Sequence, residues 1–159
     1  MPNKDPITIS PLGALSPDFA ADAVFAIIQD AIPDSWDFKT LKNLLAREQA
    51  FGFLAMQNTM VIGFIAGTKL FEESEILSFG VLKKYQGQGI GERLLKHFLE
   101  ESKAGGASKI LLDVADDNVA AIGLYQKYNF TVFGVRERYY ARGGQNRVNA
   151  ILMALSLAK

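Results

Sequence analysis

A glycine-rich turn is the part of this sequence best suited to hold a phosphate. Its residues are Gln86-Gly87-Gln88-Gly89-Ile90-Gly91. The turn lies between a predicted strand and a predicted helix, and the first amides of a helix have no partner inside it. Glycine lets a ligand approach the backbone closely, and the field at a helix N-terminus favours an anion. The arrangement suits a pyrophosphate group, with extra positive charge nearby on Lys83, Lys84 and Arg93.

By itself, the turn is compatible with more than one structure. A plain strand-to-helix connection needs no ligand, and this alternative stays open. A Walker A loop is excluded because no Gly-Lys-Ser/Thr follows. A dinucleotide-binding fingerprint fits poorly, because Gly87, Gly89 and Gly91 are spaced G-x-G-x-G and follow predicted antiparallel strands.

The hydrophobic pattern predicts the elements that must position this turn. A helix is expected to begin at Pro17 with Ser16 as its N-cap and to end at Ile32-Pro33. Its apolar stripe is Phe19, Val24, Ile27, Ile28 and Ala31. Further helices are expected from Asp37 and over 89–103 and 118–128. Strands are expected over 6–12, 51–56, 60–69, 75–82, 108–114, 130–139 and 147–157.

The order of these elements predicts an α/β (α+β) fold with one mixed sheet. Strands 51–56, 60–69 and 75–82 follow each other closely, which indicates an antiparallel meander. The helix 89–103 is long enough for a right-handed crossover between parallel strands, so helices are expected on both faces. At 159 residues the chain has the size of a single domain, residues 1–159.

Composition excludes several kinds of chemistry. There is no cysteine, which removes disulfides and thiolate sites, and the single histidine makes a metal site improbable. His97 lies in an apolar stretch of helix and is expected to be packed or at the surface. Lys+Arg and Asp+Glu are 17 each, which argues against direct binding of nucleic acid or membrane. With neither a signal peptide nor a run of ~18 apolar residues, a cytoplasmic protein is predicted.

Two segments resemble signatures of the GNAT superfamily of N-acetyltransferases. VLKKYQGQGIGERLL resembles its acetyl-CoA-binding motif, Gln/Arg-x-x-Gly-x-Gly/Ala, with Gln86, Gly89 and Gly91 at the defining positions. LLDVADDNVAAIGLYQKYNF resembles the family's later strand and helix. The C-terminal ERYYARGGQNRVNAILMAL is similar to RimI-type ribosomal-protein-alanine N-acetyltransferases, although Asn149 stands where these commonly have Asp.

This resemblance implies a cosubstrate site for acetyl-CoA, without a metal. In the family, strands 75–82 and 108–114 splay apart, and pantetheine lies in the gap against strand backbone, here that of Phe79, Gly80 and Val81. The pyrophosphate is then expected on the amides of Gly87, Gln88, Gly89, Ile90, Gly91 and Glu92. Asn118 is expected either to bind pantetheine or simply to cap the following helix, and both alternatives stay open.

The resemblance also implies three catalytic candidates. Tyr125 lies two helical turns after Asn118 and has a phenol, with an ordinary pKa of ~10, that suits a proton donor to a thiolate. The alternative is a core tyrosine. Asp113 precedes Tyr125 by the interval at which RimI-type enzymes place a glutamate that is implicated as the general base. The alternative is that Asp113 is only a solvent-facing carboxylate on the strand. Glu75 on the facing strand is the second candidate base, or else a charge at the sheet edge.

The implied acceptor is an N-terminal α-amine, in particular that of a ribosomal protein beginning with alanine. Acetylation of a small amine and a non-catalytic acyl-CoA-binding module are the alternatives. Four aromatic residues lie on loops that flank the acceptor groove in this fold: Trp36, Phe38, Tyr139 and Tyr140. They are expected either to bind the backbone of a peptide acceptor or to be core aromatics, and both alternatives stay open. Glu72, Glu73 and Glu75 are expected either to attract a cationic acceptor or to form a solvated turn.

Overall fold

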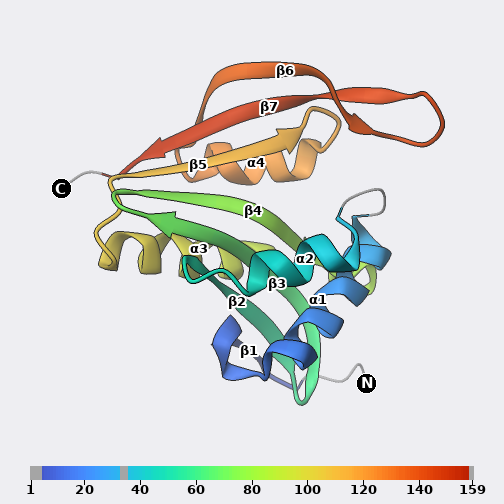
Figure 1. Cartoon of the computed structure of the whole chain (residues 1–159), viewed down its shortest axis with the longest axis vertical. Coiled ribbons are helices and arrows are strands. Elements are labelled where there is room, and N and C mark those ends of the chain that lie inside the picture. Colours follow the sequence, from blue (N-terminus) through green and yellow to red (C-terminus); the bar gives the residue numbers. More distant parts are fainter. Residues whose placement is uncertain (1–4, 33–35, 158–159) are drawn as a thin grey trace.

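The computed structural model describes residues 5–32 and 36–157 (Figure 1). The strands are β1 (Ile7–Pro11), β2 (Ala50–Gln57), β3 (Met60–Leu70), β4 (Glu73–Val81), β5 (Lys109–Ala115), β6 (Thr131–Ala141) and β7 (Arg147–Ser156). The α-helices are α1 (Pro17–Ala31), α2 (Phe38–Leu45), α3 (Ile90–Ala104) and α4 (Val119–Lys127). Two short 3-10 helices, η1 (Leu12–Ala14) and η2 (Lys83–Tyr85), were not predicted. The predicted helix end at Pro33 lies outside the described residues.

The seven strands form one sheet in the order β1-β2-β3-β4-β5-β7-β6. The pairing is antiparallel throughout except between β4 and β5, which run parallel on either side of α3 in the chain. The predictions of a meander and of a mixed sheet are therefore confirmed. Helices α1 and α2 cover one face of the sheet over β2 to β4, and α3 and α4 lie behind it (Figure 1).

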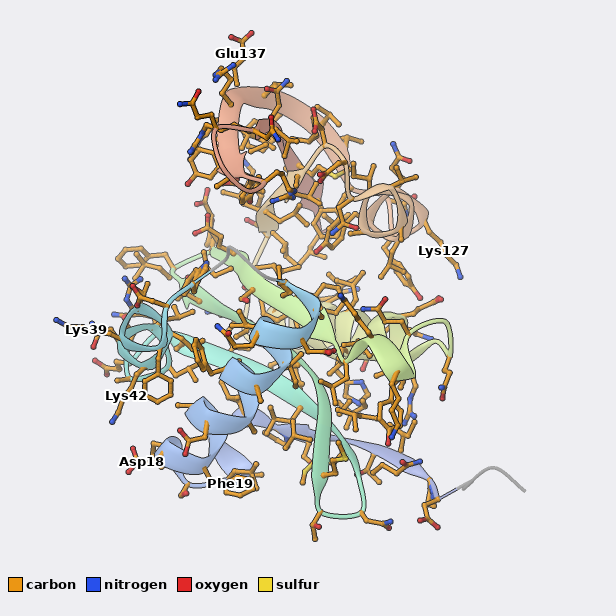
Figure 2. The ribbon with its side chains drawn as sticks, turned by 90° about the vertical axis from the view of Figure 1, so that its right-hand side faces the viewer. Asp18, Phe19, Lys39, Lys42, Lys127 and Glu137 are labelled. Carbon is orange, nitrogen blue, oxygen red and sulfur yellow. The ribbon has the colours of Figure 1, made fainter. Side chains whose placement is uncertain are left out.

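Side-chain caps start the helices where the sequence predicts them. The Ser16 hydroxyl accepts from the Phe19 amide at 3.4 Å, and the Asp37 carboxylate accepts from the Thr40 amide at 2.7 Å. The prediction that Phe19 belongs to the buried stripe of α1 is wrong, because this side chain is 51% exposed and projects outward (Figure 2). Ala20 and Ala21 pack instead, one helical turn before Val24 and its neighbours.

A β-bulge in β4 separates the two parallel strands. The β3–β4 register steps from Gly67↔Ile76 to Ala66↔Ser78, which leaves Leu77 outside it. Pairing between β4 and β5 stops at the same place, with Ile76↔Leu112. A bulge bends its strand and increases the local twist, so β4 turns away from β5 beyond this residue. Figure 1 shows the two strands together at one end and apart at the other.

Gly67 lets β3 and β4 approach closely beside this bulge. A Cβ at Gly67 would overlap the Glu75 carbonyl oxygen and lie 2.9 Å from the Phe98 ring. The carbonyl belongs to the β4 backbone and Phe98 is fully buried, so neither can yield without moving the strand or the core. The geometry that opens the sheet therefore requires a glycine at this position.

We expect Gly67→Ala to destabilise the fold by about 1–3 kcal/mol, the usual cost of overpacking. The matched control is Gly123→Ala in α4, where no described atom lies within 4 Å of an added Cβ. The control should be neutral or stabilising by up to about 1 kcal/mol, because alanine favours helix over glycine. Urea unfolding measures both, and equal stability of the two variants would contradict the close approach at Gly67.

Candidate active site

A cleft of about 380 Å³ lies where β4 and β5 diverge. Its walls come from both strands, from the start and middle of α4 and from the end of β6. The lining residues that bear on chemistry are Phe79, Asp113, Asn118, Tyr125, Tyr139 and Tyr140. The splayed strands thus bring both predicted catalytic positions of β5 and α4 to one opening.

The glycine-rich turn joins the end of β4 to α3 at the same side of the sheet. Gly87 and Gly89 have φ values of +81° and +80°, in the left-handed region that favours glycine. The Gln86 side-chain amide donates to the Val81 carbonyl at 2.9 Å and ties the turn to the strand. The Arg93 amide donates to the Gly89 carbonyl at 3.1 Å, and no side chain among the described residues caps α3. The preceding amides are therefore available to an anion.

Gly91 has a different role from the two left-handed glycines. Its φ is not positive, and an added Cβ would meet the Phe79 ring at an ordinary 3.5 Å. The fold therefore tolerates a side chain at this position, although a ligand lying on the first turn of α3 would not.

The Glu92 side chain is already engaged within the protein. Its carboxylate accepts from Lys127 Nζ at 2.8 Å and from the Tyr128 hydroxyl at 2.7 Å, joining the start of α3 to the end of α4. These bonds hold the pKa of Glu92 below its ordinary value, while the bond to the carboxylate raises the pKa of Tyr128 to about 12. Because the Glu92 carboxylate is engaged in this way, Glu92 can contribute to a phosphate site only through its backbone amide, which is the group that the sequence predicted.

Tyr125 is buried at the inner wall of the cleft, with 5% of its surface exposed. Its ring centre lies 6.3 Å from that of Phe79 and 5.4 Å from that of Phe130. Burial, with a smaller contribution from Tyr140, raises the pKa of the phenol above its usual range. The hydroxyl is thus protonated at neutral pH, as a proton donor must be.

Asn118 caps α4, as one of its two predicted roles requires. Its side-chain oxygen accepts from the Ala121 amide at 3.2 Å, and the residue also lines the cleft. The side-chain nitrogen takes no part in that bond. Capping is therefore confirmed, and a bond to a ligand is compatible with it.

The two candidate bases occupy different surroundings. Asp113 lines the cleft, and its carboxylate lies 3.7 Å from the Arg136 guanidinium. Glu75 instead lines a neighbouring hollow together with Glu72 and Glu73. Partial burial, followed by the charge of Asp113, raises the pKa of the Glu75 carboxyl. The structure thus brings Asp113, and not Glu75, into the same cleft as Tyr125.

The mouth of the cleft contains one pair that the sequence analysis missed. Three of the four expected aromatic residues line it: Trp36, Tyr139 and Tyr140. Phe38 packs on Phe25 instead, with ring centres 5.3 Å apart. Arg142 forms two hydrogen bonds with the Asp117 carboxylate, at 2.8 and 2.9 Å. An arginine in a glycine-containing hairpin has no recognisable spacing relative to an aspartate 25 residues away, so no sequence signal could have found the pair.

Residues 21–130 match the sequence profile of the acetyltransferase (GNAT) family. The chain belongs to this family. It is 31% identical over 136 residues to the ribosomal protein bS18-alanine N-acetyltransferase of Haemophilus influenzae, which covers 86% of this chain and 92% of that protein. The crystal structure of the ribosomal-protein-alanine N-acetyltransferase from Escherichia coli superposes with a TM-score of 0.87 at 31% identity, over 97% of each chain.

A third relative connects the GNAT fold with the cosubstrate. The GNAT acetyltransferase of Elizabethkingia anophelis, whose structure has acetyl-CoA bound, is 26% identical, with a TM-score of 0.75 over 97% of this chain and all of that one. The chain is thus an acetyl-CoA-dependent N-acetyltransferase of RimI-like character. The resemblance read from the sequence is confirmed.

Two further observations concern metal ions and membranes. In the described part of the chain, no three His, Cys, Asp or Glu side chains gather so as to hold a metal ion. No described helix is long and apolar enough to cross a membrane.

A second hollow of about 370 Å³, bordered by α1, α2 and β2, is mostly apolar and has Lys42 and Glu101 as its charged residues. It has no phenol beside a carboxylate, so the cleft is the candidate active site.

We expect Gly91→Glu to abolish the rise in melting temperature that acetyl-CoA gives the wild-type protein. The new carboxylate would fill the first turn of α3 and repel the pyrophosphate, while the backbone at this position accepts a side chain. Gly123→Glu adds the same side chain at an exposed position of α4 and should keep the full shift. A full shift in Gly91→Glu, in a thermal-shift titration, would place the pyrophosphate elsewhere.

Proposed function

We propose that this protein acetylates the N-terminal α-amine of proteins that begin with a small residue such as alanine, a ribosomal protein among them. The acceptors named for the relatives from Haemophilus influenzae and Escherichia coli support this proposal. The observation that carries it is the cleft, where a buried phenol and a carboxylate lie below a mouth formed by two tyrosines and an arginine.

The residues of the cleft divide the proton transfers between them. Asp113 takes the proton from the attacking amine, directly or through a water, as the amine nitrogen bonds to the thioester carbonyl carbon. Tyr125 donates its proton to the sulfur as the carbon–sulfur bond breaks. Burial raises the pKa of Tyr125, so the phenol is protonated before the thiolate forms. Glu75 remains the alternative base, acting from the neighbouring hollow.

The cosubstrate roles follow the shape of the opened sheet. Beyond Ile76, the β4 backbone at Phe79, Gly80 and Val81 has no β5 strand paired beside it and can bond pantetheine. Gln86 holds the turn, and the amides of residues 87–92 receive the pyrophosphate. Asn118 contributes its free side-chain nitrogen from the cap of α4.

An N-terminal amine suits this arrangement better than a lysine side chain. Its ordinary pKa is about 7.7–8.0, against about 10.4 for lysine, so far more of it is already neutral at pH 7. Asp113 has a shorter reach than the glutamate of RimI-type enzymes. With an N-terminal amine, fewer of the acceptor molecules would need Asp113 to remove a proton before the attack. A single domain, a cytoplasmic location and a reaction without a metal stay predictions from the sequence.

The acidic hollow favours a polyamine as a second candidate acceptor. Glu72, Glu73 and Glu75 line it, next to the β4–β5 cleft that contains Asp113. Such a surface attracts cations, and it could equally hold a basic second residue of a peptide. Acetylation rates of an Ala-Arg peptide and of spermidine separate the peptide acceptor from the polyamine.

We expect Tyr125→Phe to lower kcat by about 10²-fold with little change in the affinity for acetyl-CoA. The substitution keeps the ring that packs between Phe79 and Phe130 and removes only the proton donor, a type of catalysis worth roughly 10²–10⁴. Steady-state kinetics with a thioester-release assay measures the effect. An unchanged kcat would leave Tyr125 as a core tyrosine and pass the donor role to another group.

We expect a peptide beginning Ala-Arg to be acetylated faster than its N-terminally blocked form with an internal lysine, and faster than spermidine. The reason is the larger neutral fraction of the α-amine at pH 7. Initial rates at equal acceptor concentration, measured by free thiol, decide the order. Preference for spermidine would support the polyamine candidate, and preference for the blocked peptide would replace the α-amine by a lysine side chain.

A further inference from the structure

Strand β6 is distorted over Glu137, Arg138 and Tyr139, so the distortion includes the first of the two tyrosines at the cleft mouth. Its register with β7 steps from Arg136↔Ala150 to Tyr140↔Val148. Glu137, Arg138 and Tyr139 therefore face a single β7 residue, Asn149. Within this excess, Arg138 has a φ of +52°, a left-handed backbone that residues other than glycine seldom adopt. Such a conformation persists only where the surroundings hold it.

Two β7 side chains bond the backbone groups that the distorted ladder leaves over. The Asn149 side-chain oxygen accepts from the Arg138 amide at 2.9 Å. The Arg147 Nε donates to the Arg138 carbonyl at 2.7 Å, and its Nη2 donates to the Tyr139 carbonyl at 2.8 Å. One acceptor and a fork of two donors thus satisfy three backbone groups of the distorted segment, the Arg138 amide and the carbonyls of Arg138 and Tyr139.

The distortion decides where the tyrosines point. Consecutive side chains of a regular strand lie on opposite faces of the sheet, yet Tyr139 and Tyr140 both line the cleft. Their rings meet edge to face, with centres 5.0 Å apart and planes at 84°. The Glu137 side chain extends away from the body of the protein (Figure 2). A regular β6 would turn one of the two tyrosines away from the acceptor.

The same segment is connected to the candidate base. The Arg136 guanidinium, immediately before the extra residues, lies 5.4 Å from the centre of the Tyr139 ring and 3.7 Å from the Asp113 carboxylate. A shift of the distorted segment would therefore change the mouth of the cleft without moving the glycine-rich turn, and it would reach Tyr125 only through Tyr140.

We propose that Asn149 and Arg147 are positioning residues that hold Tyr139 and Tyr140 over the acceptor, with Asn149 acting through its side-chain oxygen alone. This inference rests on the proposed acceptor site. It predicts which replacements are tolerated, since any side chain of the same reach with an acceptor oxygen can serve at position 149. At position 147 the fork of two donors is needed, which a lysine ammonium does not supply.

The kinetic test compares Asn149→Ala with Asn149→Asp, and Arg147→Lys with wild type. We expect Asn149→Ala and Arg147→Lys to raise the KM for the Ala-Arg peptide by roughly tenfold or more, since a misplacement of about 1 Å can cost up to ~10². The KM for acetyl-CoA should stay within about twofold, and Asn149→Asp should behave like wild type in both. An unchanged peptide KM in Asn149→Ala, or an equal loss with Asn149→Asp, would overturn the proposal.

A double-mutant cycle identifies the residues through which Asn149 acts. In a Tyr139→Ala/Tyr140→Ala background, Asn149→Ala should add little to the peptide KM, because the side chains it positions are gone. If the two effects on the peptide KM multiply, Asn149 acts by another route and the proposal is wrong. A loss of melting temperature shared by Asn149→Ala and Asn149→Asp would show a general structural role and would also overturn it.

Amide hydrogen exchange tests the same bonds without any acceptor. The Arg138 amide should exchange slowly in wild type and in Asn149→Asp, and at least about tenfold faster in Asn149→Ala, because only alanine removes its acceptor. Equal exchange rates of the Arg138 amide in all three proteins would overturn the proposal that Asn149 holds this amide. Should the wild type fail to acetylate any N-terminal peptide, the proposed function fails, while the exchange rates still decide whether Asn149 holds the strand.

Discussion

Beyond Ile76, the β4 backbone diverges from β5 and no longer pairs with it, and the rest of the site depends on this gap. The bulge at Leu77 produces it, and Gly67 on β3 lets the chain pass close enough for the bulge to form. Since the strands are parallel, the gap opens at the end where β4 runs on toward α3 and β5 toward α4. Unpaired strand backbone, the glycine-rich turn and the Asn118 cap therefore meet at one edge of the sheet, the usual place for a ligand between parallel strands.

This arrangement explains how a chain with equal numbers of acidic and basic residues can bind a ligand as charged as acetyl-CoA. The proposed attraction is local: the amides at the start of α3 have no intrahelical acceptor, as at any helix start, and the left-handed glycines at 87 and 89 shape the turn that leads into them. The helix field adds to these donors over a few ångströms. Glu92, the one acidic residue in the first turn, is held by Lys127 and Tyr128, which keeps its charge compensated beside the anion site.

The sequence predicted most of the elements and the residues of the cleft, and what it missed has a common physical cause. Periodicity and capping residues are local, so α1, α2 and the parallel crossover could be predicted, as could the places of Tyr125 and Asp113. The bulge could not, because Leu77 is an ordinary strand residue and only its pairing is unusual. The contacts of Arg142 with Asp117 and of Glu92 with Tyr128 join residues 25 and 36 positions apart. Phe19 was misplaced because an apolar residue in the first turn of a helix can face solvent at modest cost.

Two phenols line the cleft, and their surroundings separate their roles. Burial raises the pKa of both, that of Tyr140 to about 12, so each is protonated at neutral pH and protonation alone does not single out the acid. Tyr125 is fixed between Phe79 and Phe130, and Phe79 belongs to the part of β4 that pairs with β3 but not with β5, where pantetheine would lie. Tyr140 contacts Arg142 and Tyr139 at the mouth instead, and in the positioning proposed here it depends on the Asn149 side-chain oxygen, which accepts from the Arg138 amide. Asparagine and the aspartate common in RimI-type enzymes both offer that oxygen, so the departure at Asn149 leaves the assignment intact. These surroundings support the proposal that Tyr125 donates the proton to the sulfur and that Tyr140 contacts the acceptor.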